Sequence, residues 1–281
     1  MDATRVAILG AIAGSTIFLG LPVGRIRSLP PRGKGFLSVV SAGILLFIFW
    51  DVVSAAHQII DGALGKALDG GARGPFVLDV VMVIAGLTLG ALGLAWLEGK
   101  VWHREPSPIA GGSADAVAVE QATEMLAAIR RRAALSLGMM IAVAIGLHNF
   151  SEGLAIGVSA RSGQITLATT LIVGFALHNA TEGFGIVGPL GGERPSWRWL
   201  LLAGLVAGGP TFLGTLVGYR VSSLPLEIAF FALAAGAILY VVGQIWGSAS
   251  RRFSTQFVLT GLIVGFTLGL LTDLAVSAGG G

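Results

Sequence analysis

Two short segments of this chain combine residue types that bind metal ions. Residues 148–153 read His-Asn-Phe-Ser-Glu-Gly, and residues 178–183 read His-Asn-Ala-Thr-Glu-Gly. The shared pattern, His-Asn-x-Ser/Thr-Glu-Gly, therefore occurs twice at a separation of 30 residues. Imidazole and carboxylate groups bind zinc, iron, manganese and cobalt. The doubled pattern indicates a site for a divalent transition metal, and affinity alone does not select among these metals.

The spacing inside each copy suits a helix. Side chains four residues apart lie on one helical face, about 6 Å apart along the axis. The histidine and the glutamate of each copy therefore project together, with the asparagine at the side of the same face. If the two faces meet, two imidazoles, two carboxylates and two amide oxygens converge. The predicted metal ligands are His148, Asn149, Glu152, His178, Asn179 and Glu182.

Other functions are compatible with a His–Glu pair. One is an inert polar network between helices, and another is a proton-conducting relay. A third is an intramembrane zinc-dependent hydrolase, which requires an open metal position and a free general base. The chain has four histidines, no cysteine and no His-Glu-x-x-His sequence. We therefore expect no enzyme and no prosthetic group, with the divalent metal as a transported substrate.

The composition predicts a membrane protein. Hydrophobic residues make up 54% of the 281 residues and charged residues only 12%, about half the usual share of roughly 25% in soluble domains. The 43 glycines lie within apolar runs, where small residues let helices approach closely. The net charge is +3, and no basic block is interleaved with aromatic residues, so we expect no nucleic-acid partner.

Eight apolar stretches are long enough to cross a bilayer, which takes about 20 helical residues. They predict an all-α polytopic protein that lies in a lipid bilayer and has one transmembrane domain over residues 1–281. A long loop is expected at about 99–132, and it ends in a short polar helix. The eight stretches are residues 4–23, 37–60, 76–98, 133–160, 164–189, 198–219, 224–247 and 256–278.

The distribution of basic residues predicts the orientation. Thirteen of the eighteen Lys and Arg fall on the side that holds the long loop. Because such residues favour the cytoplasmic side, both termini are expected outside the cell inner (plasma) membrane.

Four further polar residues in the apolar stretches are candidates for an ion pathway, because polar groups are costly in hydrocarbon. Asp51 lies in the middle of the second span, and His57 lies nearer the outer end of that span. Gln244 belongs to the seventh span and Asp273 to the eighth. Hydrogen bonds to neighbouring helices are the alternative role for each of them.

The paired motifs resemble those of the ZIP (Zrt/Irt-like) family of metal transporters in its prokaryotic branch. Its fourth helix carries His-Asn-x-Pro-Glu-Gly, with a similar motif in the fifth. The resemblance implies that helices four and five are sandwiched between two inverted three-helix repeats. It also implies transport of zinc, or of iron, manganese or cadmium, toward the cytoplasm, in a homodimer with a binuclear centre.

Position by position, the resemblance implies one metal bound by the four His and Glu side chains of the motifs. The adjacent metal would use Asn149 and Asn179, with the two glutamates bridging. Three departures qualify this. Ser151 and Thr181 replace the motif prolines, Gly209 stands where relatives carry a glutamate before Pro210, and the seventh helix lacks its usual glutamates. Hydroxyls that bond back to the preceding turn bend a helix more weakly than proline does.

Overall fold

The computed structural model describes residues 2–26, 30–101, 116–161, 179–190, 193–221 and 224–278, and these ranges contain helices and no strand. The predicted all-α class is therefore confirmed for the described part of the chain. Its helices are α1 (Ala3–Ser15), α2 (Ile17–Gly20), α3 (Pro31–Leu68), α4 (Gly74–Val101), α5 (Ala116–Arg161), α7 (Trp197–Arg220), α8 (Leu224–Ser250) and α9 (Thr255–Ala278), with 3₁₀ turns η1 (Leu21–Arg25) and η2 (Gly188–Leu190).

Seven helical stretches of the described residues are long and apolar enough to cross a membrane, and each overlaps one of the eight predicted spans. The predicted fifth span, residues 164–189, lies mostly outside the described residues. Its last part is described, and residues 179–187 are helical. The polar helix predicted before the fourth span is the first part of α5, which runs on without a break for 46 residues.

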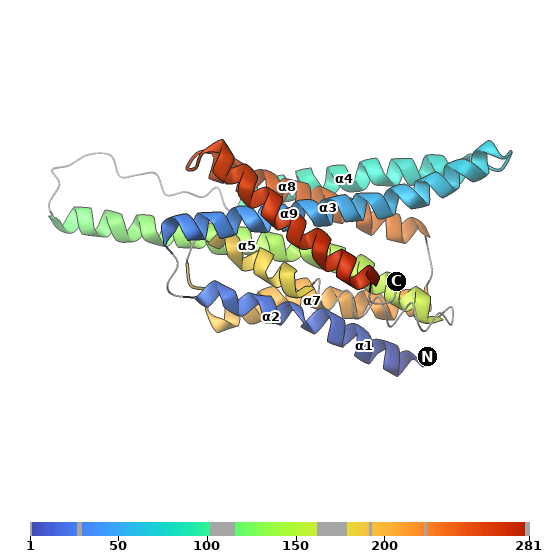
Figure 1. The fold of residues 1–281 in the computed structure, drawn as a ribbon, viewed down its shortest axis with the longest axis horizontal. Helices are drawn as coiled ribbons and strands as arrows, with labels where there is room; N and C mark the ends of the chain where they lie inside the picture. Colours follow the sequence, from blue (N-terminus) through green and yellow to red (C-terminus); the bar gives the residue numbers. More distant parts are fainter. Residues whose placement is uncertain are drawn as a thin grey trace.

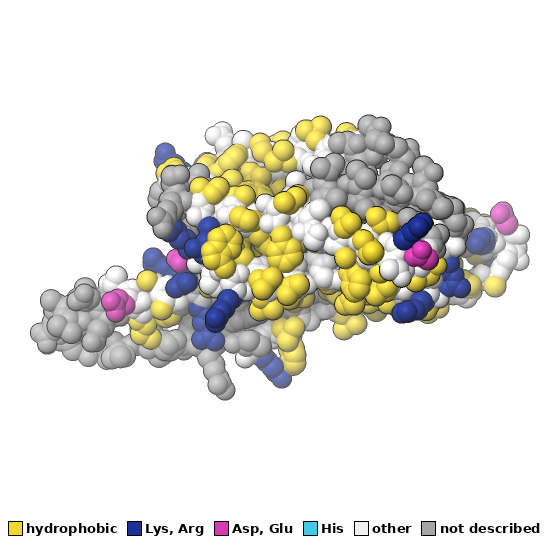
Figure 2. All heavy atoms as spheres, turned by 90° about the horizontal axis from the view of Figure 1, so that it is seen from below, with side chains coloured by type: hydrophobic (Ala, Val, Ile, Leu, Met, Phe, Trp, Pro, Cys, Tyr) yellow, Lys and Arg dark blue, Asp and Glu magenta, His cyan; other side chains and the backbone are white. Residues whose placement is uncertain are grey.

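The helices run roughly side by side along one long axis (Figure 1). The start of α1 and the end of α9 lie at the same end of this bundle, where the α3–α4 hairpin also projects. The first part of α5 projects from the opposite end. On the face drawn in Figure 2, hydrophobic side chains cover the middle, and the Lys and Arg side chains lie toward the two ends. This distribution suits a protein whose middle faces lipid.

Glycines at the helix contacts let backbones touch. A Cβ atom on Gly153 of α5 would overlap the carbonyl of Thr211 on α7, and one on Gly14 of α1 would overlap the carbonyl of Gly208. Similar glycine contacts join α4 to α8 and α3 to α9. The prediction that the glycines serve close helix packing is confirmed at these contacts.

One span has a break in its helix, and another contains a proline within a continuous helix. The first span changes from α1 to α2 at Thr16, whose hydroxyl donates to the Ala13 carbonyl at 2.7 Å. The helix α7 contains Pro210, which has no N–H to offer the carbonyl of Val206. A break or a proline of this kind leaves backbone carbonyls available to side chains from other helices.

Candidate metal site

The two copies of the motif meet inside the bundle. His148 Nε2 lies 3.3 Å from Glu152 Oε1 on the same helix, as expected for positions i and i+4. The same nitrogen lies 3.6 Å from Glu182 Oε1, which belongs to the second copy. All three side chains are at most 5% exposed. The structure thus brings an imidazole and two carboxylates together in a space closed to solvent. His178, the other predicted imidazole ligand, lies outside the described residues.

These separations have the size of ligand-to-ligand distances around an ion. Two ligands bound at about 2.0–2.1 Å to a tetrahedral zinc ion are about 3.3–3.4 Å apart. Among the described residues, however, no group of three His, Asp or Glu side chains surrounds a common point as a finished metal site. His148 contacts both carboxylates directly, so a metal must replace these contacts when it binds.

Each of the two motif asparagines donates a hydrogen bond to a backbone carbonyl of a neighbouring helix. Asn149 donates its amide N–H to the Ala207 carbonyl of α7 at 3.0 Å, and Asn179 donates to the Ala13 carbonyl of α1 at 3.0 Å. Both side chains are fully buried, and neither Oδ1 atom accepts a hydrogen bond from the described residues. Because each N–H₂ group is fixed by a backbone carbonyl, each oxygen is left as a buried acceptor.

The break at Thr16 and the proline of α7 lie next to these asparagine contacts. Ala13, the acceptor for Asn179, is three residues before the break at Thr16. Ala207, the acceptor for Asn149, is three residues before Pro210. Small residues allow α1 and α7 to pack closely, because the backbones of Gly14 and Gly208 are in contact. Each asparagine is therefore positioned by the backbone of a helix outside the motifs.

The remaining motif residues shape the helices themselves. Ser151, which replaces a motif proline, donates its hydroxyl to the Leu147 carbonyl at 3.3 Å, and α5 stays continuous through this turn. Gly153 packs against the backbone of α7, and Gly183 packs against the backbone around Ile17 and Gly20. The last residue of each motif thus sets the distance between its own helix and a neighbour.

One of the four predicted pathway residues, Asp51, lies near this cluster, and a second, Asp273, lies near Asp51. Asp51 of α3 is half-buried, interacts electrostatically with His148, Glu152 and Glu182, and has Asp273 of α9 as a further charged neighbour. His57 is exposed and lies six residues further along α3.

The structure places Gln244 in a different part of the protein. It hydrogen-bonds to Glu98 of α4 and Tyr240 of α8, in a cleft that no motif residue lines. Glu98 was not among the predicted functional residues. Glu98 lies near the end of an apolar run, where charged side chains are usually solvated. Its interaction with α8 is therefore evident only from the hydrogen bonds in the structure.

The fold and the site define a polytopic α-helical membrane protein with a buried cluster of imidazole, carboxylate and amide groups between its central helices. A sequence profile described as "ZIP Zinc transporter" matches residues 110–243. Over these residues the chain is similar to the ZIP family, whose members are membrane transporters and not enzymes.

Relatives from several bacteria are similar to this chain. The "Zinc transporter ZupT" of Corynebacterium glutamicum is 28% identical over 268 residues, covering 91% of this chain and 95% of the relative. The "Zinc transporter GufA" of Myxococcus xanthus is 32% identical over 142 residues, covering 49% of this chain and 56% of the relative. The "Zinc transporter ZIPB" of Bordetella bronchiseptica is 30% identical over 141 residues, covering 49% of this chain and 45% of the relative.

Proposed function

We propose that this protein carries divalent transition-metal cations, with zinc as the main substrate, across the inner membrane toward the cytoplasm. The metal binds between α5 and the helix at residues 179–187. Its ligands are His148, Glu152 and Glu182 together with His178, and the oxygens of Asn149 and Asn179 face an adjacent position. The relatives named above as zinc transporters support zinc as the substrate.

The observation that carries this proposal is the meeting of the two motif copies. Glu182 lies beside His148 although the two residues are 34 positions apart in the chain. Two carboxylates buried together are strongly unfavourable unless a positive charge accompanies them. A dication supplies that charge, and imidazole with carboxylate is a ligand set that zinc accepts. The cluster therefore suits a cation better than an inert hydrogen-bond network.

Three polar residues define a proposed path for the metal ion from the end of the bundle that holds the termini to the motif site. Asp51 and Asp273 are electrostatic neighbours on α3 and α9, and His57 lies closer to the outer end of α3. A cation that enters from that end meets His57, then the two aspartates, and then the motif site. Negative groups along such a path concentrate cations before they are bound.

The arrangement in the membrane follows from the charges and the helix contacts. The opposite end of the bundle carries the excess of Lys and Arg, which supports a cytoplasmic position for it and an outside position for both termini. The paired contacts of α4 with α8, α3 with α9 and α1 with α7 are those expected of two three-helix repeats around the central helices. We infer that two copies assemble as a homodimer.

Purified protein in liposomes tests the proposal. Vesicles loaded with a zinc-sensitive dye are expected to show saturable zinc influx that protein-free vesicles lack, and manganese, iron and cadmium are compared as competitors. A pH-sensitive dye in parallel vesicles separates metal transport from a proton relay. Proton flux without added metal, together with no zinc influx, would contradict metal transport and favour the relay.

The hydrogen bonds of Asn149 and Asn179 lead to a second prediction about zinc uptake. Replacing Asn149 or Asn179 by leucine removes both the oxygen donor and the hydrogen bond to the neighbouring helix. We expect the rate of zinc uptake to fall about tenfold to hundredfold in each variant, the range seen when groups that support a metal site are lost. Gln58→Leu, which makes a similar change at an exposed position of α3, is the control and is expected to retain uptake. Wild-type rates in both asparagine variants would show that the amides do not contribute.

A further inference from the structure

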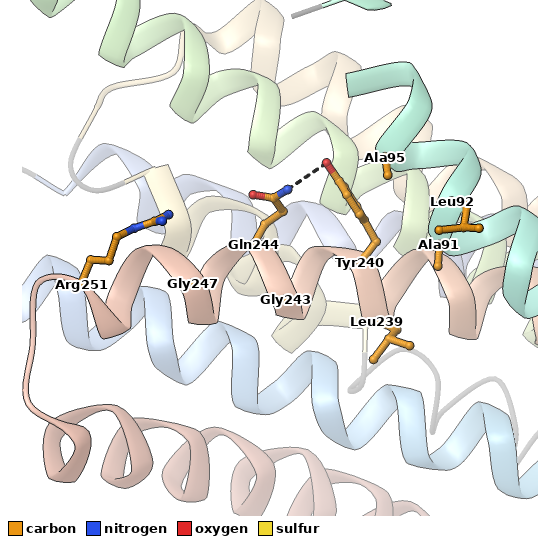
Figure 3. Close-up of a pocket in the computed structure, with 9 residues that line it drawn as sticks. All are labelled: Ala91, Leu92, Ala95, Leu239, Tyr240, Gly243, Gln244, Gly247 and Arg251. Carbon is orange, nitrogen blue, oxygen red and sulfur yellow. Dashed lines mark hydrogen bonds between the residues drawn. The ribbon is translucent and has the colours of Figure 1, made fainter. Parts of the chain in front are cut away.

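The Thr211 hydroxyl of α7 is a buried polar group outside the two motifs. Thr211 is fully buried, and its Oγ1 atom has no hydrogen bond with any described residue. The hydroxyl of Thr215, one turn further, is paired, since it donates to the Thr211 carbonyl at 2.7 Å. In the cleft between α4 and α8, Gln244 and Tyr240 are likewise hydrogen-bonded to each other (Figure 3). Because an unpaired buried hydroxyl is unfavourable, Thr211 is a candidate ligand for a bound group.

The usual partner of this hydroxyl is occupied by Asn149. A threonine hydroxyl in a helix commonly bonds to the carbonyl four residues before it, which here belongs to Ala207. That carbonyl accepts a hydrogen bond from Asn149 Nδ2 at 3.0 Å, and within a helix it also accepts the backbone N–H of residue 211. A carbonyl oxygen has two lone pairs, so both are in use. The Thr211 side chain and the Asn149 amide therefore lie beside the same carbonyl, and the hydroxyl is left for another ligand.

Thr211 is also close to the segment of α1 that holds the second asparagine. A Cβ atom placed on Gly14 would lie 3.2 Å from the Cβ atom of Thr211. Gly14 follows Ala13, whose carbonyl accepts a hydrogen bond from Asn179 Nδ2 at 3.0 Å. Thr211 therefore stands between the backbone anchors of the two motif asparagines. The Oδ1 atoms of both asparagines are, like Thr211 Oγ1, buried and without a hydrogen bond in the described part of the chain.

The face of α7 that meets the asparagines contains Thr211 and not Gly209, the position at which the resemblance to ZIP transporters leads to the expectation of a glutamate. Ala207, Gly208 and Thr211 are all buried. Residues two positions apart point about 200° apart around a helix, so Gly209 lies on the opposite side from Thr211. A Cβ atom on Gly209 would have no described atom within 4 Å. The helix α7, which contains no Asp or Glu, therefore offers the asparagines a neutral hydroxyl.

A fourth buried oxygen belongs to Glu152. Its Oε1 atom lies 3.3 Å from His148 Nε2, whereas its Oε2 atom is buried and has no hydrogen bond within the described residues. The next residue, Gly153, packs on the Thr211 carbonyl, which brings Glu152 near Thr211. Two amide oxygens, a hydroxyl and a carboxylate form an oxygen-only set, and such a set suits manganese or magnesium better than zinc. A Ser or Thr hydroxyl binds Mg²⁺ in this way in the P-loop.

We propose that the Thr211 hydroxyl is a ligand for a second metal ion, bound beside the two asparagines, and that this position favours manganese over zinc. The proposal rests on the proposed transport site and adds to it one ligand from α7. Glu152 lies between the two metal positions. The first position combines imidazole with carboxylate, which suits zinc. The second has oxygen ligands alone, which suit a cation such as Mn²⁺.

Equilibrium dialysis of the purified full-length protein against Mn²⁺ or Zn²⁺, followed by elemental analysis, tests the proposal without any measurement of transport. Thr211→Val removes the hydroxyl and keeps nearly the same side-chain shape. Its affinity for Mn²⁺ is expected to fall at least about tenfold, the lower end of the loss seen when groups that support a metal site are removed. Its affinity for Zn²⁺ is expected to remain that of the wild type. Thr211→Ser restores a hydroxyl and is expected to restore Mn²⁺ binding.

Thr215→Val is the matched control, because it makes the same change at a buried position one turn further, where the hydroxyl is bonded to a backbone carbonyl. It is expected to bind Mn²⁺ as the wild type does. Wild-type Mn²⁺ affinity in Thr211→Val would overturn the proposal, and so would an equal loss of Mn²⁺ and Zn²⁺ binding together with a lower unfolding midpoint. Glu152→Gln is expected to weaken binding of both metals. Wild-type Zn²⁺ binding by Glu152→Gln would instead contradict the transport site itself, so the two failures are distinguishable.

Discussion

Replacing Glu152 by glutamine is expected to lower the initial rate of zinc uptake at least about a hundredfold. Glutamine has nearly the same shape, so the packing of α5 is kept, while the negative charge beside His148 is lost. Loss of groups that only support metal ligands already costs roughly 10–100-fold, and Glu152 is itself a proposed ligand. Glu182→Gln is expected to have a similar effect because Glu182 contacts the same imidazole. The measurement is dye-reported zinc influx in liposomes at matched protein content.

Glu124→Gln provides the comparison for this prediction. Glu124 lies on the same helix at an exposed position before the predicted fourth span, residues 133–160, so the same chemical change is expected to leave uptake unaltered. Zinc binding to the detergent-solubilised protein, measured by calorimetry, shows whether the loss occurs at binding. Wild-type uptake in both Glu152→Gln and Glu182→Gln would refute the proposed transport site.

Replacing Gly153 by valine is expected to destabilise the protein by about 3 kcal/mol or more, the upper part of the range for overpacked sites. A Cβ atom at this position would overlap the backbone of Thr211 and approach that of Thr215. Backbone atoms inside a helix cannot rotate away as a side chain can, so α5 and α7 must separate. The midpoint of thermal unfolding is expected to fall by about 10 °C. Zinc uptake is also expected to fall, because Glu152 is the preceding residue.

The control for this substitution is another glycine inside a transmembrane helix. Gly93 of α4 has no atom within 4 Å of the place where a Cβ would stand. Gly93→Ala is therefore expected to leave the unfolding midpoint unchanged or to raise it, since alanine favours a helix over glycine by about 0.5–1 kcal/mol. An unfolding midpoint of Gly153→Val equal to that of the wild type would show that the α5–α7 contact is looser than described.

The spans were predictable because they depend on local sequence. Apolar length and basic flanks predict each helix in the described part of the chain, and α7 was placed within one residue at both ends. The interruption at Thr16 was not predicted, because a threonine between apolar residues gives no breaker signal of the kind proline gives. Residues 116–132 were expected to form a short helix that leads into the fourth span, and in the structure they are the first part of α5.

The site was predictable in part for the same reason. The helical spacing of His148 and Glu152 predicts their contact, and the duplication suggests that Glu182 joins them. The partners of the two asparagines were not predictable, because Ala13 and Ala207 act through backbone carbonyls that every residue possesses. Gln244 was placed among the pathway candidates from its polarity alone. Its hydrogen bonds to Glu98 and Tyr240 depend on the packing of α4 against α8, which local sequence does not encode.

The glycine contacts of α5 also bear on how the protein can move. Backbone contacts at glycines join α1 to α7 and α5 to α7. Because such closely packed helices separate or slide only with steric overlap, we expect α1, α5 and α7 to move as one body. The helix at residues 179–187 is joined to the same body through Gly183 and Ile17. A rearrangement that preserves these contacts displaces the described motif residues together and leaves their mutual distances intact. We infer that movement of the surrounding helices exposes the proposed metal site to one side of the membrane or the other while its residues stay together.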